Sequence, residues 1–150
     1  MRLLLELGAD PGVPNIDNCT PLLAAAGVGA LGDGDESAGT EDEAVEAARL
    51  LLDLGADINA VDDNGETAMH GAAYQNRWEL VKLLADRGAD INVWNRKNKW
   101  GWTPLMIAQG HRPGNFRPAP ESIAAIEKVM RAKGVEPPKP IPHTNRPDYR

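Results

Sequence analysis

The sequence predicts an all-α solenoid in which helix–turn–helix units stack side by side and project short β-turn fingers. Two short elements alternate along the chain. The first contains Gly-Ala-Asp, at residues 8–10, 55–57 and 88–90, and the second begins with threonine, at residues 20–23, 67–70 and 103–106. Gly55 and Gly88 are 33 residues apart. A fixed period of this size indicates a repeat protein, in which each unit packs only against its neighbours.

The outer units are longer than the middle one, so they contain insertions. The distances from each threonine to the next glycine of the pattern are 35, 21 and 31 residues, the last ending at a degenerate copy around Gly134. Relative to the middle unit, 14 extra residues follow Thr20 and 10 follow Thr103, and three more precede Thr103. We therefore expect loops between the two helices of the first and last full units.

Each unit carries signals for two short helices. A threonine stands where each first helix should begin, and its side chain can accept a hydrogen bond from the backbone there. Pro21 and Pro104 follow two of these threonines, at a position where a missing N–H has no cost. Each second helix has an apolar stripe at helical spacing, as in residues 80–84, and ends at a glycine that can adopt the left-handed conformation. Turn residues tolerant of positive φ follow, namely Asn18, Gly65 and Gly101.

The middle unit, residues 62–93, carries the fullest motif. It contains Asp-Asp-Asn-Gly-Glu-Thr-Ala-Met-His-Gly-Ala-Ala and then Leu-Val-Lys-Leu-Leu and Gly-Ala-Asp-Ile-Asn. These motifs resemble the ankyrin repeat, with Ala68 in place of the usual proline, and with Leu23 and Met106 in place of the usual histidine in the neighbouring units. The resemblance covers residues 1–134. It implies an ankyrin-repeat solenoid with a partial repeat at 1–10, repeats at 15–57 and 62–90, and a capping repeat at 98–134, followed by a proline-rich tail at 135–150.

The two ends of the array differ. Seven and three residues before the capping glycine, the inner units have apolar residues, whereas the last unit has Glu127 and Arg131. A polar outer face is what a terminal repeat needs, so this end is predicted to be capped. At the other end Leu3 and Leu4 have no preceding helix to pack against. We expect the chain to be part of a longer array, and self-association is possible through this uncapped end.

Composition argues against several classes of protein. The net charge is −6 and the pI is about 5.0, which is unlike a protein that binds nucleic acid or an anionic membrane. Cys19 is the single cysteine, so no internal disulfide forms. No apolar stretch approaches the ~20 residues of a spanning helix, and no targeting signal is recognisable, so the compartment is not predicted.

No catalytic motif is present, so the sequence predicts a non-enzymatic protein. The histidines are scattered, and His70 occupies the histidine position of the repeat, where the resemblance implies a structural hydrogen bond toward a neighbouring turn. No cofactor is expected. Asp33 and Asp35 lie in an acidic insertion, but the calcium-loop pattern needs a glycine and a glutamate where Ala38 and Ala44 stand, so a solvated loop is favoured over a metal site.

The resemblance implies a protein partner and the positions that contact it. In ankyrin repeats these lie beside the turn glycine, before the threonine and after the histidine. Carried over, they are Asp63, Asn64, Glu66 and Gly71 in the middle unit, Lys99, Trp100, Trp102 and Ile107 in the next, and Ile16, Asp17, Cys19 and Ala24 in the first.

The strongest candidate surface is rich in tryptophan and basic residues. Trp94, Trp100 and Trp102 lie within nine residues and are interleaved with Arg96, Lys97 and Lys99. Tryptophan and arginine often dominate binding energy, so we expect a hot spot for a protein partner there. Trp94, just before them in the sequence, is interpreted as a brace against the neighbouring turn. Two alternatives stay open: a purely structural segment of a longer array, and a base-stacking surface for nucleic acid.

Overall fold

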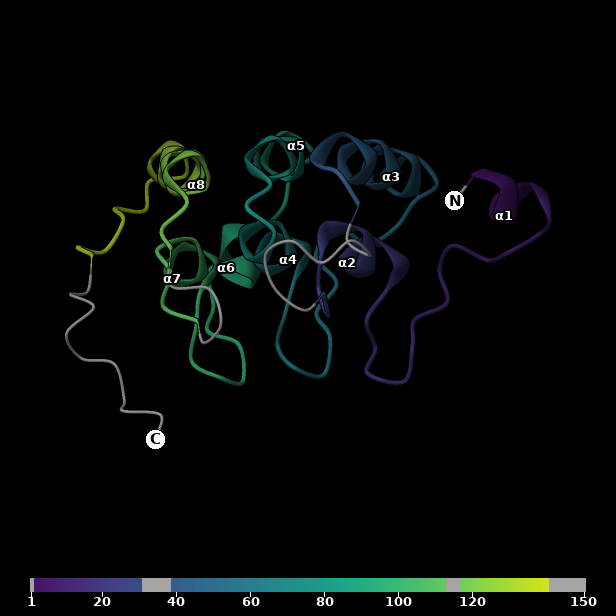
Figure 1. Cartoon of the computed structure of the whole chain (residues 1–150), viewed down its shortest axis with the longest axis horizontal. Coiled ribbons are helices and arrows are strands. Elements are labelled where there is room, and N and C mark those ends of the chain that lie inside the picture. The colour runs from purple at the N-terminus through teal and green to yellow at the C-terminus, as the bar shows by residue number, and fades with distance from the viewer. Residues whose placement is uncertain (1, 31–38, 113–116, 141–150) are drawn as a thin grey trace.

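The chain folds as two rows of short helices with a row of fingers beneath them (Figure 1). The computed structural model describes all residues except 1, 31–38, 113–116 and 141–150, so Asp33, Asp35, Glu36, the middle of the second insertion and most of the tail lie outside the described residues. The helices are α1 (Arg2–Glu6), α2 (Pro21–Ala26), α3 (Glu41–Asp53), α4 (Ala68–Tyr74), α5 (Trp78–Asp86), α6 (Ile91–Trp94), α7 (Pro104–Ala108) and α8 (Pro120–Ala132).

The rows follow the repeat order. The first helices α2, α4 and α7 lie side by side, and the second helices α3, α5 and α8 lie above them (Figure 1). Helix α4 packs between α2 and α7, and α5 packs between α3 and α8. The predicted all-α solenoid is thus confirmed.

Helices α2, α3 and α7 begin with threonine caps as predicted, whereas the Thr67 hydroxyl at the start of α4 contacts His70 Nδ1 at 3.0 Å. The Oγ1 atoms of Thr20 and Thr103 accept the backbone N–H groups three residues on, at 3.4 and 3.3 Å. Thr40 opens α3 with a reciprocal pair, in which its Oγ1 accepts the Glu43 N–H at 3.3 Å and its own N–H donates to Glu43 Oε2 at 2.8 Å. Helices α3 and α5 are followed by Gly55 and Gly88 in the left-handed conformation, with φ of 91° and 89°.

Small residues let the helices approach closely. The alanines at the centre of the rows are fully or almost fully buried: Ala26, Ala48, Ala72, Ala73 and Ala108. Gly71 in α4 marks a close backbone contact, because an added Cβ would lie 2.8 Å from the backbone nitrogen of Val28. Gly71 therefore has a packing role beneath the end of α2, and it is not an accessible contact position as the resemblance implied.

The segment that contains the three extra residues before the last full unit begins with a four-residue helical turn, α6, that the sequence did not predict. The side chain of Asp90 accepts the Asn92 N–H at 2.9 Å and so caps this turn. Trp94 at its end is only 2% exposed and belongs to the core, in agreement with its interpretation as a brace.

Arg77 holds both ends of the first insertion. Its guanidinium donates to the carbonyl oxygen of Ala25 at 3.0 Å and to that of Gly39 at 3.2 Å. The side chain is buried, and it comes from the loop between α4 and α5 of the following unit. The insertion is therefore anchored by the neighbouring repeat.

The described ends of the array match the expected contrast. Arg131 and Glu127 form an ion pair of 2.9 Å on the outer side of α8. At the other end, Leu3 and Leu7 are 65% and 76% exposed. The outer face of α8 is polar, whereas the N-terminal end presents apolar side chains to water.

Leu83 lies in the buried stripe of α5, between α3 and α8. Because truncation removes buried methyl groups and leaves a cavity, Leu83→Ala should lower the free energy of unfolding by about 2–5 kcal/mol. Asp86→Ala, an exposed change in the same helix, should stay within about 0.5 kcal/mol. Urea denaturation of both variants checks the register, and equal effects would contradict it.

Candidate protein-binding surface

Three fingers present the candidate surface, and each is folded by the same side-chain device. The fingers are residues 15–19, 62–66 and 95–102. An amide or carboxylate oxygen, from Asn15, Asp62 or Asn98, accepts the backbone N–H groups two and four residues on, at 2.8–3.1 Å. The same residue donates its own N–H to the carbonyl four residues on, at 3.0 Å in all three fingers. The finger conformation is thus fixed within each repeat.

The fingers are also joined to one another. The N–H of Asp63 donates to the carbonyl of Asp17 at 3.0 Å, and the N–H of Lys99 donates to that of Asn64 at 2.8 Å. The Asn18 amide donates to Asp63 Oδ1 at 2.7 Å, and the Lys99 ammonium contacts Asn64 Oδ1. These bonds fix the spacing of side chains that reach solvent from different fingers.

Lys99, Trp100 and Trp102 form one contiguous group. The two indole rings are stacked, with centroids 6.1 Å apart and planes 18° apart. Lys99 Nζ lies 4.5 Å from the centroid of Trp100, which is a cation–π contact. Trp100 is 48% exposed and Trp102 is half-buried, so about half of the Trp100 side chain is accessible to a partner.

The other predicted contact residues fall into two groups. Asp63, Arg96 and Lys97 are exposed and Asn64 is half-buried, in agreement with a surface role. Glu66 is 3% exposed and Ile107 is 4% exposed, so neither is accessible as the family positions implied.

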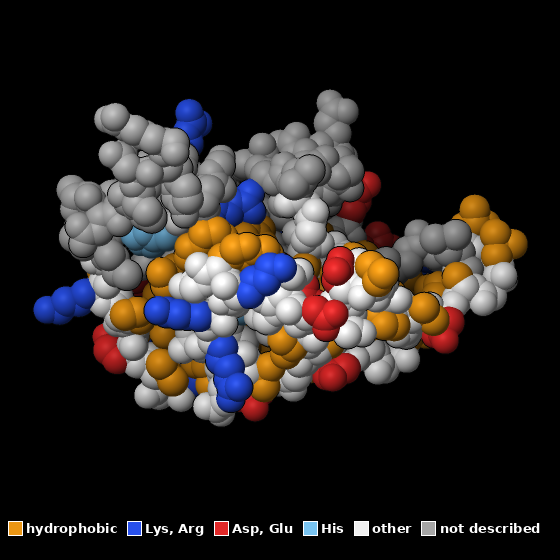
Figure 2. Space-filling model, turned by 90° about the horizontal axis from the view of Figure 1, so that it is seen from below, with side chains coloured by type: hydrophobic (Ala, Val, Ile, Leu, Met, Phe, Trp, Pro, Cys, Tyr) orange, Lys and Arg blue, Asp and Glu red, His pale blue; other side chains and the backbone are white. Residues whose placement is uncertain are grey.

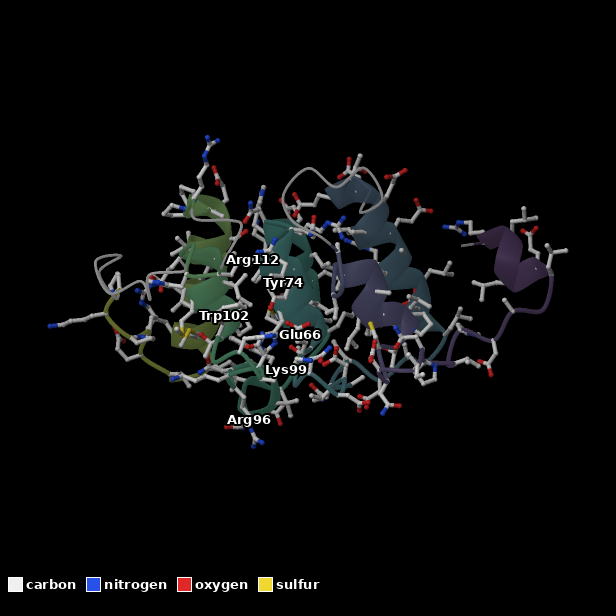
Figure 3. All side chains as sticks on the ribbon, turned by 60° about the horizontal axis from the view of Figure 1, so that its bottom comes forward. Glu66, Tyr74, Arg96, Lys99, Trp102 and Arg112 are labelled. Carbon is white, nitrogen blue, oxygen red and sulfur yellow. The ribbon has the colours of Figure 1, made fainter. Side chains whose placement is uncertain are left out.

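Glu66 is instead the centre of a buried polar cluster with Tyr74 and Asn98 (Figure 3). The Tyr74 hydroxyl donates to Glu66 Oε1 at 2.5 Å, and the Asn98 amide donates to Glu66 Oε1 at 3.0 Å and contacts the Tyr74 hydroxyl at 2.9 Å. Burial raises the pKa of Glu66 above its ordinary value, although the two hydrogen bonds act in the opposite direction. The same burial raises the pKa of Tyr74, whose hydroxyl stays protonated and serves as a donor.

The sequence did not predict the roles of Asn98 and Tyr74, nor that of Arg112, whose guanidinium lies over the Tyr74 ring at 4.7 Å from its centroid. A signal for Asn98 exists, because Asn15, Asp62 and Asn98 each stand five residues before the threonine of their repeat. Tyr74 and Arg112 have no such periodic signal.

His70 makes the structural hydrogen bonds that the resemblance implied. Its Nδ1 accepts the Thr67 N–H at 3.2 Å, and its Nε2 is 3.1 Å from the carbonyl oxygen of Arg96 in the next finger. A neutral ring protonated at Nε2 satisfies both contacts. The ring is fully buried, and this burial lowers the pKa of His70 to about 4, although the backbone contacts and Asp62 act to raise it.

Cys19, in the first finger, is not activated. Burial and the nearby carboxylates of Asp62 and Glu66 raise the pKa of its thiol to about 11. A thiol at neutral pH is a poor nucleophile, so the position has no catalytic character. Elsewhere on the first finger, Ile16 is 95% exposed.

Charge is unevenly distributed over the finger side. Figure 2 looks at this side and shows Lys and Arg side chains gathered toward the C-terminal end, with Asp and Glu side chains in the neighbouring region. Arg96, Lys97 and Lys99 belong to the third finger, whereas Asp17 and Asp63 belong to the first two.

In the part of the chain that the structure describes, no group of three or more His, Cys, Asp or Glu residues is arranged to hold a metal ion. No helix in these residues is long and apolar enough to cross a membrane.

Comparison with known proteins identifies the family. A family model described as ankyrin repeats in three copies matches residues 37–115, which is more than half of the chain. The chain is 31% identical to chicken Inversin over 123 residues, covering 77% of this chain and 10% of that protein. It is 40% identical to the neurogenic locus Notch protein of Drosophila melanogaster over 91 residues, covering 59% of this chain and 3% of that protein.

The chain therefore belongs to the ankyrin repeat family. Ankyrin repeats are in general protein–protein interaction modules without enzymatic activity. The chain spans a tenth or less of the length of these two relatives.

The buried His70 makes stability depend on pH. Because its pKa is lower in the folded protein than the ordinary 6.5, unfolding binds a proton below that pH, and stability present above pH 6.5 is lost as the pH falls toward 4. The loss from this group should reach roughly 2 kcal/mol by pH 5. The pKa of Glu66 is raised in the folded protein, so this group has the opposite effect to His70. At pH values above the ordinary pKa of glutamate, lowering the pH favours the folded state through Glu66.

Urea denaturation of the wild type and of His70→Gln at pH 7 and pH 5 measures this loss. The variant should be less stable at pH 7 but should lose less stability between the two pH values. An equal loss in both proteins would show that His70 is not the group that titrates.

Proposed function

We propose that this chain binds a protein partner through its fingers and first helices, with Trp100 and Trp102 as the hot spot. The observation that carries the proposal is the exposure of Trp100. Trp100 is 48% exposed, yet it is fixed by stacking on Trp102 and by the finger backbone. A large aromatic side chain that is already ordered loses little conformational entropy when a partner covers it.

Charged and polar side chains surround the pair and form its rim. They are Asp63, Asn64, Arg96, Lys97 and Lys99. Rim charges steer encounter and select partners more than they add affinity. Glu66 supports this surface from beneath, through Asn98, and does not itself meet the partner.

The alternative function is a purely structural segment of a longer array. A structural segment needs no exposed anchor residue. If this alternative holds, a change at Trp100 should alter neither stability nor binding. The nucleic-acid alternative is disfavoured by the net charge of −6 and by Asp17 and Asp63 on the adjacent fingers.

Trp100→Ala separates these accounts. With the chain as bait in affinity capture from a cell lysate, truncation should lower the affinity of a captured partner by about 2 kcal/mol or more, because the ring is an anchor. Thermal unfolding should change little, since half of the ring is exposed. A collapse of the fold would assign Trp100 a bracing role, and unchanged stability and binding would place the functional surface elsewhere.

Removing the rim charges should affect binding kinetics in a different way from removing the Trp100 ring. The double change Arg96→Ala with Lys97→Ala should slow association and weaken its salt dependence while the dissociation rate changes little. Stopped-flow association at several salt concentrations provides the measurement. A salt dependence equal to that of the wild type would exclude these residues from the rim.

We also propose weak self-association through the N-terminal end, supported by the exposure of Leu3 and Leu7. Sedimentation velocity over a range of concentrations should detect it in the wild type. Leu3→Lys with Leu7→Lys should abolish it, whereas Ile16→Lys, which removes an exposed apolar side chain from the first finger, should not. Association that survives the first pair of changes would contradict the proposal.

A further inference from the structure

The basic side chains of the third finger have no carboxylate partner among the residues that the structure describes. Arg96 Nε donates to the carbonyl oxygen of Asn92 at 2.7 Å, and Lys99 contacts an amide oxygen of the second finger. Lys97 is exposed. By contrast, the outer helices carry paired charges, such as Arg87 with Asp53 at 2.9 Å. Lys99 is attracted by the Glu66 carboxylate, whose pKa it acts to lower, so the positive charge left unpaired beside the exposed aromatic pair is that of Arg96 and Lys97.

A second cation lies at the other end of the same row of side chains. Arg112, from the second insertion, is 9% exposed and lies over the Tyr74 ring, with 4.7 Å from its Cζ to the ring centroid. Its Nε makes no hydrogen bond within the described residues and is fully buried, so a molecule bound at the surface meets the guanidinium through its charge and not through this N–H.

The two cationic ends are connected by aromatic side chains. Figure 3 shows Arg112, Tyr74, Trp102, Glu66, Lys99 and Arg96 following one another from the insertion to the third finger, and Tyr74 and Glu66 are buried. The contacts of Arg112 with Tyr74, and the hydrogen bonds that link Tyr74 to the third finger through Asn98, give the same order. An elongated molecule with acceptor oxygens at both ends and an apolar group between them fits this row.

We propose that the partner segment bound here is an extended acidic peptide with an apolar side chain among its carboxylates. This deepens the proposed function and rests on it. The apolar side chain covers the exposed face of Trp100 and Trp102, and carboxylates meet Arg96, Lys97 and Lys99. Another carboxylate of the same segment lies near the positive charge of Arg112.

The distribution of charge favours a short acidic peptide over a nucleic acid. Beyond the third finger, the surface carries Asp63 and Asp17. A polyanion that extends across the fingers would meet these carboxylates, whereas a peptide confines its negative charge to the basic finger and Arg112. Asn98, which the sequence places within the basic patch, is 5% exposed and is not available to a base.

Two synthetic peptides and one oligonucleotide test the proposal on the full chain. The acidic probe is Glu-Asp-Glu-Leu-Glu-Asp-Glu, the charge-reversed probe is Lys-Arg-Lys-Leu-Lys-Arg-Lys, and the polyanion is an oligodeoxythymidylate. Tryptophan fluorescence titration should detect saturable binding of the acidic probe, and NMR should show a shift of the Arg112 Nε–H signal on its addition. Equal binding of both peptides, tighter binding of the oligonucleotide, or no binding of the acidic probe would overturn the proposal.

Charge reversal provides matched variants. Lys97→Glu should lower affinity for the acidic probe by about tenfold or more, because like charges then meet. Lys133→Glu changes the net charge equally at an exposed site beyond α8 and should leave affinity within about twofold of the wild type. An equal loss in both variants would reduce the effect to net charge and contradict the proposed site.

These results separate the further inference from the proposed function. If Trp100→Ala still loses a captured partner while the acidic probe fails to bind, the surface binds proteins but not by this chemistry, and the inference fails alone. If Trp100→Ala changes neither capture nor probe binding, both fail.

Discussion

The carboxamide of Asn98 makes the interaction on which the binding surface depends. Its oxygen accepts the N–H groups of Trp100 and Trp102 at 3.1 and 3.0 Å, and its NH₂ group contacts Glu66 and Tyr74 at 3.0 and 2.9 Å. One buried side chain thus sets the finger that carries the tryptophans and joins it to the neighbouring repeat. An acceptor or donor left without a partner here would cost about 1–3 kcal/mol, so the arrangement is strongly constrained.

This constraint explains why the buried and the exposed charged side chains of this region have different roles. Glu66 is buried and accepts hydrogen bonds from Tyr74 and Asn98, whereas Lys99 and Arg96 lie at the surface and form no salt bridge within the described residues. The buried carboxylate orders the finger, and the exposed cations remain free to select a partner. Because the finger is ordered before binding, association needs little further ordering of the chain.

The sequence predicted the scaffold well because the scaffold is local and periodic. Threonine caps, left-handed glycines and the stripe of α5 each act within a few residues, so spacing alone reveals them. The burial of Glu66 was not predictable in this way. Its partner Tyr74 is eight residues away and Asn98 is 32 residues away, and only the stacking of repeats brings them together. Arg112 reaches Tyr74 from an insertion, where no period applies.

Amide hydrogen exchange in Asn98 variants tests the central role of this side chain most directly. Asn98→Asp keeps the acceptor oxygen but loses the donors to Glu66 and Tyr74, whereas Asn98→Ala loses both. In Asn98→Ala the N–H groups of Trp100 and Trp102 should exchange at least about tenfold faster than in the wild type, as expected for each lost hydrogen bond. In Asn98→Asp, as at Asp62 in the second finger, these two amides should keep more of their protection. Unchanged exchange of both amides in a folded Asn98→Ala protein would contradict the account.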